Sequence, residues 1–211
     1  MTGKYELTDE TRGGLTQIRA LRDIPRFGVR AGDLGGWIER AANLSQSGDA
    51  WVFGNAQVYG DARVSGNAQV SGNAWVSGNA WVFGNARAYG DARVFGNAQV
   101  SGNAQVSGNA RAYGDARVYE RNHTISLSGA VTPNVDNATL VRTKDGHYLQ
   151  LGCWTGTVGD LHALADSDDW PSGGGEAYRA MYAPSLHALA DFCAAHVALW
   201  TQAADETAVI A

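Results

Sequence analysis

Residues 54–65 read GNAQVYGDARVS, which is two consecutive copies of one six-residue pattern: Gly, Asn or Asp, Ala, a variable residue, Val and a second variable residue. Twelve such units follow one another without a gap from residue 48 to residue 119. The third position is Ala in every unit, and the fifth is Val in ten units and Ala in the other two. A short period kept over this length is typical of a repeat architecture, in which each unit buries its apolar face against its neighbours.

The residue types within each unit predict one short strand and one corner. Ala-x-Val alternates between apolar and variable positions, as a strand with one buried face does. A position that accepts only Ala indicates an interior so narrow that a larger side chain would overpack it. Gly and Asn or Asp adopt the left-handed backbone region at low cost, so each Gly-Asn or Gly-Asp pair predicts a corner. Such strands and corners close a narrow solenoid, most simply with three flat sides.

The units resemble those of hexapeptide-repeat parallel β-helices, in which about three hexapeptides form one turn, so that twelve units make about four turns. The resemblance favours a left-handed coil, although right-handed coils of six-residue windings also exist. The expected fold class is therefore mainly β: a capped parallel β-helix followed by a small α+β C-terminal unit.

The chain divides into four segments around this array. Residues 1–47 predict a strand-rich N-terminal cap, because a solenoid must cover the exposed strand edges of its terminal coil. Residues 48–119 are the solenoid itself. Residues 120–135 read as an irregular connector, and residues 136–211 predict a small α+β domain with a hairpin and helices.

The C-terminal domain contains one clear turn signal and two helical patterns. Lys144-Asp145-Gly146 separates two apolar-alternating segments, which predicts a β-hairpin. Residues 158–166 predict a short amphipathic helix. A second helix is expected from Glu176 to about Gln202, interrupted or kinked at Pro184.

Both ends of the chain resemble phage and prophage proteins of the hexapeptide-repeat type, a family largely without an assigned activity. The segments that carry this resemblance are KYELT (4–8), IRALRD (18–23), GDLGGWIE (32–39) and the hairpin with its sequel GCWTGT (152–157). The resemblance implies a phage- or prophage-encoded scaffold or binding protein, active as a host-interaction or anti-defence factor through protein contacts.

Charge and composition narrow the classes of partner. The net charge is −5, and residues 121–211 carry four Lys and Arg against ten Asp and Glu, which is a poor footprint for nucleic acid. No apolar run reaches membrane-spanning length and the first residues lack a signal segment, so we expect a protein of the bacterial cytoplasm, with virion association open. Cys153 and Cys193 fit no metal-site spacing; we expect two buried thiols in a reducing compartment, with a disulfide as the alternative.

Enzymatic activity is not expected, because no catalytic residue, cofactor site or metal site stands out. Many hexapeptide-repeat proteins are acyltransferases that use a His as general base near the solenoid. None of the five His residues lies between residues 48 and 119, and the repeats contain no loop for a pocket. His123, just after the last unit, is the one candidate base, and a solvated connector residue is the alternative reading. An acyltransferase-like enzyme and a virion accessory or self-assembling protein remain the alternative functions.

The fourth and sixth positions of each unit should face outward and make the contacts with binding partners. Large aromatic and Arg side chains on a rigid flat face are typical of recognition surfaces. Three units per turn would put Trp75 and Trp81 on adjacent faces of one turn, and Trp51 would face outward as well. The expected partners are a second copy of the chain, the C-terminal domain, or a host or phage protein. The predicted binding residues cluster at the corner between the two tryptophans: Trp75, Trp81, Arg87, Tyr89 and Arg93.

Overall fold

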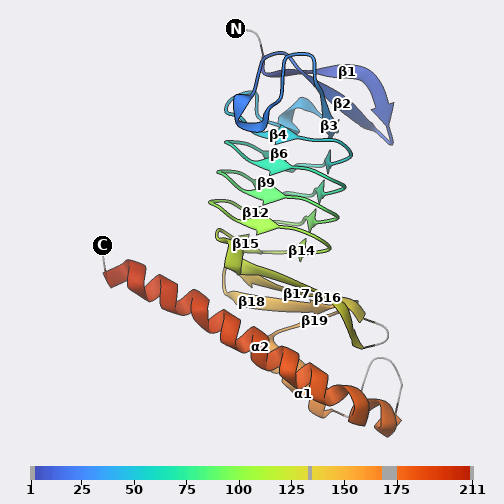
Figure 1. Cartoon of the computed structure of the whole chain (residues 1–211), viewed down its shortest axis with the longest axis vertical. Helices are drawn as coiled ribbons and strands as arrows, with labels where there is room; N and C mark the ends of the chain where they lie inside the picture. The colour runs from blue at the N-terminus through green and yellow to red at the C-terminus, as the bar shows by residue number, and fades with distance from the viewer. Residues whose placement is uncertain (1–2, 133–134, 168–174, 210–211) are drawn as a thin grey trace. The chain divides into compact units, whose positions relative to one another are not determined.

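The computed structural model describes residues 3–132, 135–167 and 175–209 of the chain (Figure 1). They form two compact units, Met1–Thr124 and Ile125–Ala211. The first unit is a β-solenoid with an N-terminal cap, and the second is a four-stranded sheet with two helices.

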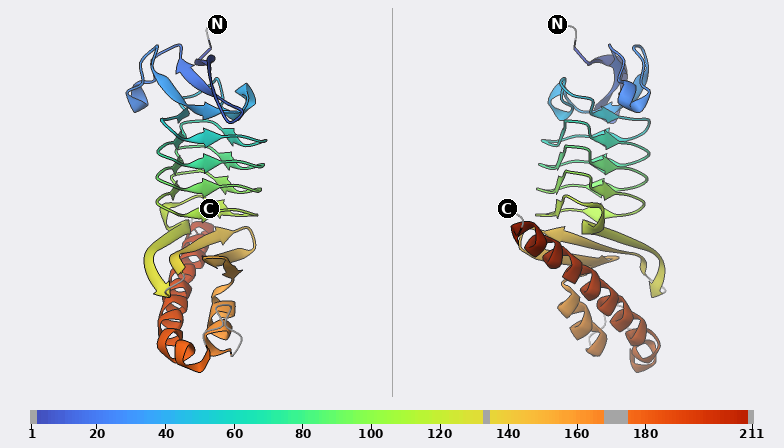
Figure 2. Two further views of the ribbon diagram at one scale, coloured as in Figure 1. Left: turned by 90° about the vertical axis from the view of Figure 1, so that its right-hand side faces the viewer. Right: turned by 60° about the vertical axis from the view of Figure 1, so that its left-hand side comes forward.

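The solenoid consists of two-residue parallel strands that recur every six residues (Figures 1 and 2). Hydrogen-bonded partners lie 18 residues apart, as Arg87 on Gln69 illustrates, so three units make one turn. The strands stack into three sheets, which are the three flat sides expected; the direction of winding stays a prediction. In chain order the strands are β4 (Trp51–Val52), β5 (Gln57–Val58), β6 (Arg63–Val64), β7 (Gln69–Val70), β8 (Trp75–Val76), β9 (Trp81–Val82), β10 (Arg87–Ala88), β11 (Arg93–Val94), β12 (Gln99–Val100), β13 (Gln105–Val106), β14 (Arg111–Ala112) and β15 (Arg117–Val118).

The interior of the solenoid is built from the third and fifth positions of the units. Every Ala at the third position and every Val or Ala at the fifth is at most 1 % exposed. This confirms the inward assignment of both positions. Successive rungs stack closely, because their backbones hydrogen-bond directly to each other. An example is the bond from Trp75 N to Ala92 O at 2.9 Å.

At each corner of the solenoid, Gly adopts the left-handed backbone conformation. Every Gly that opens a unit has a positive φ, whereas no other residue type has one in the described parts of the chain. The predicted corner at each Gly-Asn or Gly-Asp pair is thus confirmed, and it is Gly rather than Asn or Asp that adopts the left-handed conformation. Their side chains instead bond from rung to rung, as Asn67 Nδ2 does to Asn85 Oδ1 at 3.2 Å.

Parallel stacking begins within the predicted cap. Strand β3 (Leu34–Ile38) pairs with β5, and Leu44 forms a bridge to Val64, which extends the solenoid to about five turns. Gly36 takes the place of the inner Ala, because a Cβ there would lie 2.7 Å from the carbonyl oxygen of Ala56.

The cap consists of the antiparallel strands β1 (Tyr5–Arg12) and β2 (Leu15–Ala20), which continue the sheet of β3, with short 3-10 turns at Pro25–Phe27 and Ala41–Asn43. The cap also covers the side chain of Trp51, which is 1 % exposed and packs edge-on against Tyr5 with ring centroids 6.4 Å apart. The expectation that Trp51 faces solvent is therefore wrong.

Lys4 is the buried charged group of the cap. Its Nζ donates a hydrogen bond to the carbonyl oxygen of Ala50 at 2.7 Å, and its side chain is among the largest that are fully buried. Loss of solvation on burial, with a smaller effect of Arg22, lowers the pKa of Lys4 to about 8. Burial also raises the pKa of the neighbouring Tyr5 to about 12.

The last rung ends in a 3-10 turn, Arg121–His123. His123 Nδ1 accepts hydrogen bonds from the backbone N–H groups of Tyr119 at 3.1 Å and Glu120 at 3.4 Å. Strand β16 (Thr124–Thr132) follows directly. The prediction of an irregular connector over residues 120–135 is therefore wrong for most of its length, and Pro133 lies outside the described residues.

The second unit orders its strands β16, β17 (Val135–Thr143), β18 (Gly146–Leu151) and β19 (Trp154–Gly156). The β17–β18 pairing confirms the predicted hairpin, and α1 (Val158–Asp166) confirms the predicted short helix. Helix α2 (Gly175–Val209) is one helix that includes Pro184, with no interruption there. The sheet and both helices share one core: Ala138, Leu140, Leu149, Leu151, Val158, Leu161, Ala165, Leu186, Leu189, Ala190, Cys193 and Trp200.

Candidate functional site

Trp75 and Arg93 form the first contact of the candidate binding surface. They occupy equivalent positions on the paired strands β8 and β11, one turn apart. The Arg93 guanidinium carbon lies 5.1 Å from the centre of the Trp75 ring, within the range of a cation–π interaction. The Trp75 residue remains 39 % exposed, so part of the ring is open to a partner.

Trp81 repeats this arrangement on the neighbouring sheet. Its strand β9 pairs with β6, and the Arg63 guanidinium carbon lies 5.7 Å from the Trp81 ring centre. Phe83 contacts the same ring edge-on, with centroids 6.4 Å apart. Trp81 is 44 % exposed. Each tryptophan is thus held by an Arg from an adjacent rung, from the next rung for Trp75 and from the preceding one for Trp81.

The structure separates the five predicted binding residues into three groups. Trp75 and Trp81 lie on adjacent faces, as expected, and Arg93 lies beside Trp75. Arg87 and Tyr89 follow on the third face with β10, where the Tyr89 hydroxyl lies 3.2 Å from Gln105 Oε1. The prediction of one cluster at one corner is therefore wrong for these two residues, because three units per turn carry the unit after Trp81 to the third face.

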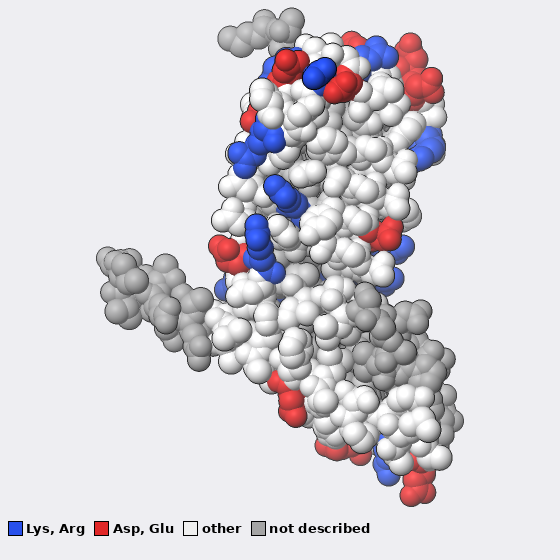
Figure 3. Space-filling view, in the orientation of Figure 1, with Lys and Arg blue, Asp and Glu red and all other residues white. Residues whose placement is uncertain are grey.

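Arg63 belongs to the candidate site although the sequence reasoning did not include it. The sequence could have revealed this pair, because Arg63 and Trp81 are separated by one turn, as Trp75 and Arg93 are. We call these four residues the Trp–Arg surface: Arg63, Trp75, Trp81 and Arg93. The space-filling view shows scattered blue Lys and Arg side chains and a few red Asp and Glu side chains on the visible side of the solenoid, with white, uncharged surface over most of the rest (Figure 3).

A shallow hollow lies beside Trp81. Its volume is about 280 Å³, and its wall combines one guanidinium, one aromatic ring, two hydroxyls and two small apolar side chains. Small-molecule sites usually occupy about 300–1,000 Å³, so this hollow fits one protruding side chain better than a coenzyme. The lining residues are Ala42, Ser45, Arg63, Val64, Ser65 and Trp81.

Several polar groups with shifted pKa values have structural partners. Burial lowers the pKa of His147, whose Nε2 accepts the backbone N–H of Val158 at 3.1 Å at the start of α1. Hydrogen bonds from the backbone and the hydroxyl of Thr157 lower the pKa of Asp160 within the cap of the same helix. Cys153 and Cys193 are both free, but Cys153 is exposed, so the expectation of two buried thiols is wrong for it. Burial raises the pKa of the Cys193 thiol to about 11. The pKa shifts of these groups therefore follow from local packing and hydrogen bonding rather than from a catalytic arrangement.

Two absences hold for the described residues. They contain no group of three or more His, Cys, Asp or Glu side chains placed to hold a metal ion. None of the helices within them is long and apolar enough to cross a membrane.

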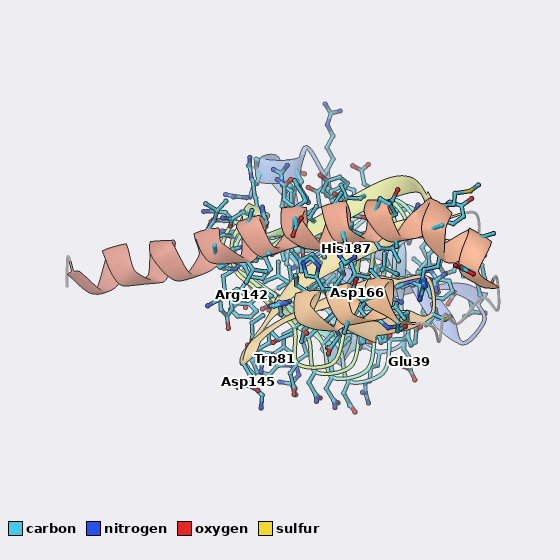
Figure 4. All side chains as sticks on the ribbon, turned by 90° about the horizontal axis from the view of Figure 1, so that it is seen from below. Glu39, Trp81, Arg142, Asp145, Asp166 and His187 are labelled. Carbon is cyan, nitrogen blue, oxygen red and sulfur yellow. The ribbon has the colours of Figure 1, made fainter. Side chains whose placement is uncertain are left out.

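The second unit contains a cluster that the sequence reasoning missed. Residues 161–166 and 186–191 both read LHALAD, once in α1 and once in α2. The two helices pack together and bring both His and both Asp side chains of these copies into contact. Seen from below, His187 and Asp166 lie where the two helices face each other (Figure 4). The exact duplication was the available signal.

Comparison with known proteins identifies the repeat. The family model described as YdcK Beta solenoid repeat matches residues 56–72, 68–84, 86–102 and 104–120. No curated protein matches the chain. The matched stretches begin at the inner Ala that precedes β5 and end just after β15, so they coincide with the stacked rungs. The stacked rungs of this chain are therefore similar to the YdcK Beta solenoid repeat.

Proposed function

We propose that this chain is a non-enzymatic scaffold or binding protein of the hexapeptide-repeat type, encoded by a phage or prophage, which holds a protein partner on its Trp–Arg surface. The observation that carries the proposal is the pair of half-exposed Trp rings, each backed by an Arg from an adjacent rung. Trp and Arg are the residues that most often dominate the binding energy of protein interfaces.

The solenoid suits this role because it fixes the rings before any partner arrives. The backbone N–H of Trp75 bonds to Ala92 O and that of Trp81 to Ala98 O, both at 2.9 Å. Each Arg restricts its Trp ring further, through a contact worth about 0.5–1 kcal/mol at an exposed site. Groups that are already ordered lose less entropy on association, so more of their contact energy contributes to affinity.

The geometry also favours a protein over a small molecule as the ligand. The hollow beside Trp81 is small, and it opens next to an exposed aromatic ring and a guanidinium. A protruding side chain of a partner would fill it while the partner's flanking surface covers Trp81. The partner is either a second copy of the chain or a host or phage protein in the bacterial cytoplasm.

A double variant tests the proposal. In Trp75→Ser with Trp81→Ser, neither ring belongs to the core, so the far-ultraviolet circular dichroism should not change. The mass in solution, measured by light scattering, should fall to that of the monomer, or the partner recovered from host lysate by the wild-type chain should be lost. Phe192→Ser is the matched control, because Phe192 is 49 % exposed in the other unit.

The alternative functions have separate readouts. An unchanged mass together with an unchanged set of recovered partners in the double variant contradicts the proposal. Turnover with a panel of acyl-coenzyme A donors would instead indicate an acyltransferase-like enzyme, and detection in purified virions would indicate a virion part.

A further inference from the structure

In both helices, the apolar and the polar residues of the LHALAD segment lie on different sides. Its apolar members enter the core of the second unit, and its His and Asp, four residues apart, lie on one side of each helix. The buried members are Leu161, Ala165, Leu186, Leu189 and Ala190. Two identical segments facing each other therefore place two His and two Asp side chains where α1 meets α2.

The four polar side chains pair across the helices rather than along them. His187 Nε2 lies 3.0 Å from Asp166 Oδ1, and His162 Nε2 lies 3.3 Å from Asp191 Oδ1. The two remaining ring nitrogens, the Nδ1 atoms of His162 and His187, lie 3.0 Å apart. Each His side chain is about one-third exposed, at 36 % and 35 %, so ions and water reach the pair.

These contacts decide which ring nitrogens can act as ligands. A neutral imidazole carries one N–H, and an ionised carboxylate only accepts hydrogen bonds. When each Nε2–H points toward its Asp, the two Nδ1 atoms are left to contact each other, and this contact is a hydrogen bond if either of them carries a proton. A divalent cation can replace that proton, because both Nδ1 atoms then offer a lone pair to the same ion.

We propose that the Nδ1 atoms of His162 and His187 bind one divalent transition-metal ion, with water completing its coordination. Imidazole nitrogen suits Zn²⁺, Cu²⁺ and Ni²⁺. A metal-binding His usually donates its other N–H to a carboxylate, which fixes the ring, and both rings have that partner here. The carboxylates of Asp166 and Asp191 also balance the charge of the ion from outside its coordination shell.

The distance between the nitrogens indicates which ion fits best. Two nitrogens about 2.0–2.1 Å from a metal are about 2.8–3.0 Å apart at a right angle, and about 3.3–3.4 Å apart at the tetrahedral angle. The observed separation is 3.0 Å. It matches the tetragonal coordination that Cu²⁺ and Ni²⁺ prefer rather than the tetrahedral coordination of Zn²⁺.

The test uses the full chain without an affinity tag, freed of metal by chelation and titrated at pH 7.5 with Ni²⁺, Cu²⁺ and Zn²⁺ in a calorimeter. We expect one equivalent of Ni²⁺ or Cu²⁺ per chain, weaker Zn²⁺ binding, and a metal-dependent rise in the thermal midpoint. His162→Gln and His187→Gln should each abolish saturable binding. His196→Gln, which changes a third His of the same unit, should leave it intact.

Two further measurements keep the test independent of folding defects. Asp166→Asn retains both metal-binding nitrogens and should weaken the affinity by about 10–100-fold. The electron paramagnetic resonance spectrum of the Cu²⁺-loaded wild-type chain should show coupling to two nitrogens. Absence of saturable binding to the wild-type chain, binding that survives both His→Gln changes, or a Cu²⁺ spectrum without two nitrogens each overturns the proposal.

Discussion

Replacing Gly90 by Ala should destabilise the solenoid much more than replacing Gly114 by Ala. Both glycines open a unit at a positive φ, 72° and 57°. A Cβ at Gly90 would lie 3.0 Å from the backbone nitrogen and 3.2 Å from the Cα of Gly108 on the next rung, whereas a Cβ at Gly114 would meet nothing within 4 Å. The pair therefore separates backbone strain, which both variants have, from the contact between rungs, which only one has.

The magnitudes follow from these two contributions. A left-handed Ala costs about 1–2 kcal/mol, and the less flexible unfolded chain returns about 0.4–1 kcal/mol, so Gly114→Ala should lose about 1 kcal/mol. Gly90→Ala adds overpacking against backbone, at about 1–3 kcal/mol more. The Gly108 backbone cannot move aside freely, because its carbonyl oxygen accepts the N–H of Asp91 at 3.0 Å.

Urea unfolding followed by circular dichroism at a β-sheet wavelength measures both variants against the wild-type chain. We expect the midpoint to fall in the order wild type, Gly114→Ala, Gly90→Ala. Equal midpoints for the two variants would contradict this prediction, since they would show that the close approach of successive corners contributes nothing to stability.

Two further changes test the ends of the solenoid. The pKa of Lys4 is about 8 in the folded chain against 10.5 for an ordinary Lys, so the unfolded state binds more protons between these values and the free energy of unfolding should rise from pH 8 toward pH 10. Lys4→Met should flatten that rise in urea unfolding curves, and an unaltered slope would contradict a buried Lys4. His123→Ala removes the acceptor of two backbone N–H groups, so the free energy of unfolding should fall by about 0.5–2 kcal/mol with no acyl transfer in either protein. Saturable acetyl-coenzyme A binding that disappears in this variant would instead make His123 a catalytic candidate.

The repeat made the solenoid predictable because its structure is local and periodic. The inward positions, the three sides and the pairing of units follow from the six-residue spacing alone. The extra rung was missed because its inward residues break that spacing: Ile38 and Leu44 are six residues apart, but Val52 follows eight residues later. The burial of Trp51 depends on contacts with Tyr5, far away in the sequence, which no local pattern contains.

The candidate site was predictable to the same extent. The column that contains Trp75 and Arg93 follows from three units per turn, and the structure brings these two side chains together. Arg87 and Tyr89 were misplaced because closeness along the chain was taken for closeness in space. Strand β16 and the LHALAD pair were missed for a shared reason: each depends on pairing with a segment outside the solenoid, where no period extends.

The three-sided winding makes the outer surface rearrangeable while the interior stays the same. Every unit supplies the same inward Ala and nearly always the same inward Val, so gaining or losing one unit leaves each rung equally well filled. The outward residues beyond that point all rotate to the next side, however, so loss of residues 84–89 would carry Arg93 away from Trp75. A gain of three units restores every side and only lengthens the rod, by about 4.7–4.9 Å per turn. Duplication or deletion of whole units thus changes, in fixed steps, which residues face each side and how long the solenoid is. The packing of the interior stays the same.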